Sequence, residues 1–167
     1  MRKVITAEKP DGRSYVQSDD VVGTTSFGSM DLEHLWRADS PPTVPAGGEA
    51  PPAMSFPPPG GVWVLTWTVP PGATGERPEN DEAENGEAEN GEAENGERPG
   101  FHVTDSVDVN LVLSGSVVLE LDDGEVALTA GDLVVVNGTR HAWRNDSAEA
   151  VRVLSTIIGA ARADSAG

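Results

Sequence analysis

The stretch "HVTDSVDVNLVLSG", residues 102–115, decides the fold of this chain. Its second half is rich in Val and Leu and ends in Ser-Gly, which is typical of a strand that runs into a turn. On one continuous strand, His102, Thr104, Asp108 and Asn110 have the same parity and point to one face. The opposite face is mostly apolar. The pattern alone therefore favours a barrel with the apolar face inside.

The sequence after this stretch continues as short β-branched runs separated by turns rich in Gly and Asp. The runs are "SVVLELD", "EVALTAGD", "LVVVNG", "TRHAWRN" and "AVRVLSTIIGA". Turns such as "SG" and "DG" between such runs indicate hairpins, so we expect a continuous antiparallel meander. Because so many strands in a small domain must close on themselves to remove exposed edges, the fold class is all-β, a β-barrel or jelly roll.

The sequence before this stretch contains further strand signals. In "VWVLTWTV", Trp63 and Trp67 share one face of a predicted strand with Leu65 and Val69. "KVITA" and "RSYVQS" are compatible with two strands separated by the turn "EKPDG". "MDLEHLWRADS" fits either a helical turn or a strand, and we expect its His34 to lie on the surface.

Two segments do not read as regular structure. Residues 41–60 hold eight prolines and are predicted to form an extended surface connection. Residues 75–100, with the repeat "ENGEAENGEAENGE", lack large apolar side chains and are predicted to form a long disordered acidic loop inserted between strands. We therefore expect a single domain over residues 1–167, with N-terminal strands in 1–40 and a core barrel at about 61–70 and 101–159.

Composition excludes several classes of function. The formal net charge of -17 disfavours nucleic acid and anionic membranes as partners, because phosphate binding needs Lys and Arg. The absence of cysteine excludes thiolate catalysis and Cys-ligated zinc or iron–sulfur sites. No apolar run has the length of a signal peptide or a membrane span, so we expect a cytoplasmic protein.

The run at 102–115 resembles the first motif of the cupin family, which has two histidines one residue apart, then a glutamate and a glycine. Gly115 fits the terminal glycine of that motif and His102 its first histidine. Asp108 stands where the family has glutamate, and Thr104 stands where it has the second histidine. The resemblance thus includes two departures that weaken a metal site.

The run "GDLVVVNGTRHAWRN" resembles the second cupin motif, with matches at Gly131, Gly138, His141 and Asn145. The resemblance covers residues 101–159 and extends to "VWVLTWTV". It implies a cupin-type jelly-roll barrel that turns the polar face of the first motif inward, opposite to the expectation from the pattern alone. Cupins are frequently dimers, so we expect a homodimer.

The resemblance implies a site at His102, Asp108 and His141. Two imidazoles and one carboxylate can bind one divalent metal with open positions, or act as a metal-free acid–base set. Thr104, Asn110, Trp63, Trp67 and Trp143 are the predicted substrate-binding residues, with the tryptophans either packing the core or walling the site. Arg13, Arg37 and Arg140 are candidates to hold a carboxylate or enolate.

Three functions fit this set of residues. The first is an enzyme of secondary, polyketide-type metabolism that catalyses a cyclisation or dehydration on a small organic substrate. The second is a metal-dependent oxygenase or decarboxylase with iron, manganese or zinc on His102, Asp108 and His141. The third is a ligand-binding module without turnover.

Overall fold

The structure is a computed structural model that describes residues 1–44, 55–73 and 100–162, and every regular element in these ranges is a β-strand. The strands are β1 (Arg2–Glu8), β2 (Ser14–Val21), β3 (Thr25–Phe27), β4 (Met30–Ala38), β5 (Val62–Val69), β6 (Ser106–Ser114), β7 (Ser116–Leu121), β8 (Gly124–Thr129), β9 (Leu133–Asn137), β10 (His141–Arg144) and β11 (Val151–Gly159). The all-β prediction is confirmed. The ambiguous segment around His34 is a strand, β4.

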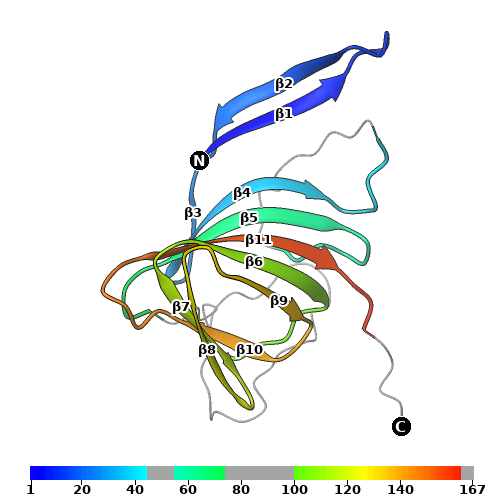
Figure 1. Ribbon diagram of the computed structural model, residues 1–167. Helices are drawn as coiled ribbons and strands as arrows, with labels where there is room; N and C mark the ends of the chain where they lie inside the picture. The colour runs from blue at the N-terminus through cyan, green and yellow to red at the C-terminus, as the bar shows by residue number, and fades with distance from the viewer. Residues whose placement is uncertain (45–54, 74–99, 163–167) are drawn as a thin grey trace.

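Two sheets form a jelly-roll barrel (Figure 1). The larger has the order β3-β4-β5-β11-β6-β9, and the smaller has the order β10-β7-β8. The C-terminal strand β11 lies in the middle of the larger sheet, between β5 and β6, and is antiparallel to both. The side chains between the sheets form the core, which includes Leu65, Val69, Val112, Val117, Leu119, Val136 and Val153.

The prediction of a continuous meander was wrong. The hairpin at the "DG" turn exists, because β7 pairs with β8. At "SG", however, the chain passes from one sheet to the other, since β6 pairs with β9 and β11 while β7 pairs with β8 and β10. Gly115 makes this passage with φ +77°, and a Cβ there would lie 2.8 Å from the Ala150 carbonyl oxygen. The crossing therefore needs glycine.

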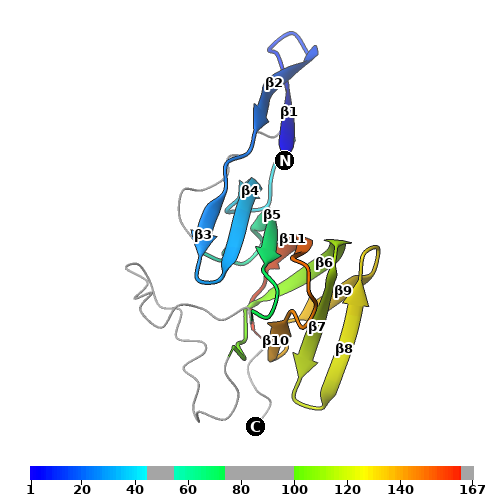
Figure 2. The same ribbon diagram turned by 90° about the vertical axis from the view of Figure 1, so that its left-hand side faces the viewer.

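The N-terminal hairpin β1–β2 stands clear of the two sheets in both views (Figures 1 and 2). Its two strands pair as the turn "EKPDG" predicts. The amino group of Met1 forms an ion pair with Glu33 on β4, which ties the base of the hairpin to the larger sheet.

The predicted loop 75–100 lies, except for Gly100, outside the described residues, as does the part of the 41–60 connection from 45 to 54. The assignment of residues 1–167 to a single domain stays a prediction. In the ranges that the structure describes, no helix is long and apolar enough to cross a membrane.

Candidate functional site

The polar face of β6 points into the barrel. Ser106, Asp108 and Asn110 are buried, whereas the intervening Val107 and Val109 are only half-buried on the outer face. The pairing of Asp108 with Ile157 and of Asn110 with Ser155 on β11 aligns these side chains with the inner face of the larger sheet. The inward orientation implied by the resemblance is the observed one, and the expectation of an apolar face inside was wrong for this strand.

His102 lies outside β6, so the assumption of one continuous strand through residues 102–110 was also wrong. Its backbone instead pairs with that of His141 through two hydrogen bonds, His102 N to His141 O at 2.9 Å and His141 N to His102 O at 3.0 Å. This bridge brings the two imidazole rings to a centroid distance of 4.4 Å, with 53° between their planes. Two histidines 39 positions apart in the sequence therefore form a ring pair.

Both imidazoles are held by a backbone carbonyl. His102 Nδ1 lies 3.0 Å from Gly100 O, and His141 Nδ1 lies 2.8 Å from Thr139 O. Because a carbonyl oxygen only accepts, each Nδ1 carries a proton, and Nε2 is the nitrogen that holds the lone pair whenever the ring is neutral. Burial, reinforced by the charge of His102, lowers the pKa of His141 to about 4. His141 is therefore a neutral side chain at pH 7.

Asp108 is the carboxyl group of the site. Its side chain is 8% exposed, and its Oδ1 has no hydrogen-bond partner. Burial raises the pKa of Asp108 above its usual value, while the Ser106 hydroxyl and the charge of His102 act in the opposite direction. Thr104, at the position of the family's second histidine, is buried and accepts a hydrogen bond from the Ser106 hydroxyl at 2.9 Å.

An aromatic chain extends from the histidine pair into the core. The His141 and Trp143 rings meet edge-on at 5.9 Å, and Trp143 lies 5.2 Å from Trp67. Trp67 Nε1 donates to Ser155 Oγ at 2.7 Å, and this hydroxyl donates to Asn110 Oδ1. Trp67 Nε1 and Asn110 Oδ1 are thus both hydrogen-bonded to Ser155. These two residues therefore contribute to the shape of the site and not to hydrogen bonding of a ligand by these atoms.

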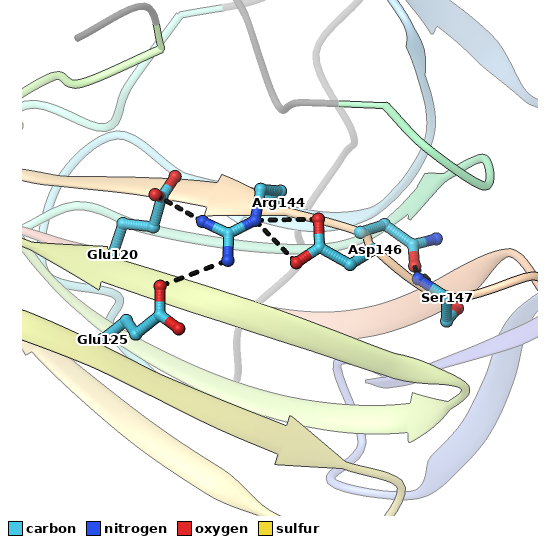
Figure 3. A network of polar contacts seen from close by, with 6 residues as sticks. Glu120, Glu125, Arg144, Asp146 and Ser147 are labelled. Carbon is cyan, nitrogen blue, oxygen red and sulfur yellow. Dashed lines mark hydrogen bonds and ion pairs between the residues drawn. The ribbon is translucent and has the colours of Figure 1, made fainter.

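The strand β10 that carries His141 is fixed from its outer side by Arg144. Figure 3 shows the guanidinium between the carboxylates of Glu120 on β7, Glu125 on β8 and Asp146. Asp146 and Glu125 raise the pKa of Arg144 further above its already high value, so the charge is permanent. One cation thus connects all three strands of the smaller sheet, although partial exposure limits its contribution to about 1 kcal/mol.

The expectation that His34 lies on the surface was wrong. Its side chain is buried, and its ring stacks on Trp63 with a centroid distance of 5.2 Å and 10° between the planes. The guanidinium of Arg37 lies over the same Trp63 ring at 5.6 Å. Alternation of Leu32 with His34 along a strand is the sequence signal that could have found this site.

A bulge in β4 brings His34 and Arg37 to the same face. Positions 34 and 37 have opposite parity, so a regular strand would separate them. The register with β5 shifts after His34, which pairs with Leu65, so that Arg37 pairs with Trp63. The inner face therefore receives both side chains.

The other two candidate arginines lie elsewhere. Arg13 pairs with Asp11 at the exposed tip of the N-terminal hairpin. Arg140 pairs with Asp122 and lies 4.8 Å from the Phe101 ring centroid. Of the three arginines, Arg37 is the one that contacts a predicted site residue.

A three-ligand metal site does not fit the residues that the structure describes. Among them, no group of three or more His, Asp or Glu side chains is arranged to hold a metal ion. The two Nε2 lone pairs of His102 and His141 are suitable donors, but Thr104 replaces an imidazole with a weak ligand.

Parts of this chain match a known family model and two curated proteins. The family model of the cupin domain matches residues 89–157. A 55-residue stretch is 47% identical to phomopsin biosynthesis cluster protein C' of Diaporthe leptostromiformis, covering 30% of this chain and 29% of that protein. A 50-residue stretch is 44% identical to oryzines biosynthesis cluster protein J of Aspergillus oryzae (strain ATCC 42149 / RIB 40), covering 29% of this chain and 28% of that protein. The chain thus spans less than a third of the length of these curated relatives.

Among solved structures, the cupin domain of Schizosaccharomyces pombe Cnp3 matches over 95% of this chain and 87% of its own, with a TM-score of 0.54 and 11% identity. At this level of identity the match shows a shared fold.

Proposed function

We propose that this chain, whose residues 89–157 match the cupin domain model and whose fold is that of a cupin domain, is an acid–base enzyme acting on a small organic molecule in secondary metabolism. The observation that carries the proposal is the ring pair of the half-buried His102 and the buried His141, with the buried Asp108 near enough for the charge of His102 to act on its carboxyl group. The names of the two partly matching relatives, both biosynthesis cluster proteins, support the metabolic setting.

The residues have distinct roles in the proposed reaction. His102 is the proton-transfer group, since its Nε2 carries the lone pair when Nδ1 donates to Gly100 O. The Asp108 carboxylate stabilises, through its charge, the imidazolium that forms when His102 takes a proton. His141, neutral at pH 7, packs against His102 without adding a second charge to the site.

This set suits removal of a proton next to a carbonyl group, followed by loss of water or by ring closure. Dehydration needs one group to accept a carbon-bound proton and the same or a second group to protonate the leaving hydroxyl. Both reactions are redox-neutral, so the balance needs no co-reactant. We propose a cyclase or dehydratase, with a polyketide-type carbonyl compound as substrate.

The test against a metal-dependent oxygenase or decarboxylase is metal removal. The substrate is obtained as the intermediate that accumulates when this gene is deleted from the producing strain, and its conversion by purified protein is followed by mass spectrometry. We expect conversion within twofold of the untreated rate after dialysis against a chelator, with bound metal measured by plasma mass spectrometry. Loss of conversion that returns with iron, manganese or zinc would support the metal-dependent alternative instead.

We also propose that the chain forms a homodimer through the outer face of the larger sheet. This face carries an apolar row on three central strands and on the edge strand β9, namely Val62 and Val64 on β5, Leu154 and Ile158 on β11, Val107, Val109 and Leu111 on β6, and Leu133 and Val135 on β9. Several of these side chains are well exposed, with Leu133 at 57%. A second copy brings an identical apolar face, the usual basis of two-fold dimers.

Substitution of Ile158 by glutamate is expected to convert the dimer to monomer at about micromolar concentration, because the charge would be buried at the interface. Ile158 is already 39% exposed in the single chain, so the fold should tolerate the change. Val126→Glu, at an exposed apolar position on the smaller sheet, is the matched control. Sedimentation velocity measures the result, and a monomeric wild type or an unchanged dimer in the Ile158 variant would refute the proposal.

A further inference from the structure

Three buried polar atoms on the inner face of the larger sheet have no hydrogen-bond partner. They are His34 Nδ1, Trp63 Nε1 and Asp108 Oδ1. Each side chain is more than nine-tenths buried, with Trp63 at 2% and His34 at 8% exposure. Buried polar atoms are nearly always paired, because an unpaired one loses its hydrogen bonds to water without replacement, so three on one face are candidates to bind a ligand.

Strand pairing places these atoms along one row. Asp108 on β6 pairs with Ile157 on β11, Ile157 pairs with Trp63 on β5, and Trp63 pairs with Arg37 on β4. His34 stacks on the Trp63 ring. The row therefore has Asp108 at one end and the cluster of His34, Trp63 and Arg37 at the other.

The cluster is suited to a negatively charged acceptor. The indole Nε1 of Trp63 can only donate. Burial and the charge of Arg37 lower the pKa of His34, which is then a neutral ring able to donate from Nδ1. The Arg37 side chain is 10% exposed and supplies the positive charge.

Arg37 retains donor capacity for such a ligand. Its Nε donates to Asp39, and its Nη1 donates to the carbonyl oxygen and hydroxyl of Ser55 at 2.8 and 2.9 Å. No hydrogen bond from Nη2 to another described residue is present. The partner carboxylate, Asp39, is 70% exposed, so solvent screens much of its effect on the guanidinium.

We propose that His34, Trp63 and Arg37 bind a carboxylate group of the substrate. One carboxylate oxygen accepts from Trp63 Nε1 and His34 Nδ1, and the other faces the Arg37 guanidinium. The assignment of the reacting end to Asp108 and His102 rests on the proposed function, whereas the carboxylate site does not depend on it.

The row also sets the length of the substrate. Asp108 and Trp63 are separated by two strand spacings, or about 10 Å between backbones at ~4.8 Å per spacing. A substrate that reaches both ends carries its carboxylate about this far from the reacting carbon. The ligand class is thus an elongated organic acid.

Octanoate is the probe, because its chain spans a comparable length, and octanamide is its uncharged counterpart. Protein labelled with nitrogen-15 is titrated with each, and the indole N–H signal of Trp63 is followed by NMR after assignment through Trp63→Phe. We expect octanoate to shift this signal and to bind at least tenfold more tightly than octanamide. Equal binding of the two, or no shift with octanoate, would overturn the proposal.

Two variants test the donors separately. Arg37→Met is expected to weaken octanoate binding at least tenfold and to leave octanamide binding unchanged, while Trp63→Phe removes the N–H and keeps a ring for His34. Arg2→Met, which removes the same charge from an exposed ion pair with Asp19, is the control and should bind as wild type. Octanoate affinity in Arg37→Met equal to that of the control would refute the site. If Trp63→Phe does not fold, the octanoate and octanamide affinities of the wild type, Arg37→Met and Arg2→Met still decide.

Discussion

Replacement of Asp108 by asparagine is expected to lower the rate of product formation by about 10²–10⁴-fold. Asparagine has the same shape and fits the same buried position, but it cannot carry the charge that stabilises a protonated His102. The rate is measured by mass spectrometry on the intermediate that accumulates without this gene. Asp122→Asn, at an exposed carboxylate that pairs with Arg140, is the control and should retain the wild-type rate.

The Asp108→Asn substitution is expected to leave the free energy of unfolding at neutral pH equal to that of the wild type or higher. Burial raises the pKa of Asp108 in the folded state, so the proton is released more readily from the unfolded chain, and stability falls as pH rises from the unfolded pKa through the folded pKa. Asparagine removes this loss. Loss of activity with retained stability separates catalysis from folding, whereas an unchanged rate in folded Asp108→Asn would favour a ligand-binding module without turnover.

Replacement of Asn145 by aspartate is expected to lower the free energy of unfolding by about 3–5 kcal/mol. Asn145 is fully buried, and its Nδ2 donates to the carbonyl oxygens of Val69, Pro70 and Glu149 at 2.8–3.1 Å. A carboxylate would face these oxygens without a proton to donate. The side-chain oxygen can still accept from Ser147, so the loss is confined to the donor side.

Urea denaturation at pH 7 measures this effect, and Asn137→Asp at an exposed position of β9 is the matched control. A change below about 1 kcal/mol for Asn145→Asp would show that the amide does not hold β5, β10 and the turn before β11 together. The bonds of Asn145 give a structural reason for the asparagine that ends the second motif. Its role is to join strand ends and not to contact substrate.

Much of the strand content could be predicted from the sequence because strands follow local rules. The segments that form β5 to β11 all begin and end close to the runs of β-branched residues and their turns. The "DG" turn predicts its hairpin because β7 and β8 are neighbours in the chain. The "SG" turn does not, because the path of the chain beyond it depends on which distant strand lies beside β6.

The candidate site, like the fold, could be predicted only in part from the sequence. Spacing places Asp108 and Asn110 on one face, and the resemblance supplies the direction of that face, but neither predicts that His102 leaves the strand to pair with His141. The alternation of Leu32 with His34 is a local signal for the burial of His34, but it applies only to a strand, and the mixed spacing of this short segment does not decide between a strand and a helical turn.

The sequence by itself determined the all-β class, the positions of most strands and the polar face of β6, because period-two alternation and turn chemistry act between near neighbours. Only the tertiary structure decided the rest. The insertion of β11 between β5 and β6 aligns Asp108 with Trp63, and the bulge after His34 brings Arg37 to the inner face. These contacts join residues far apart in the chain, so their free energy depends on the whole barrel and not on any local run.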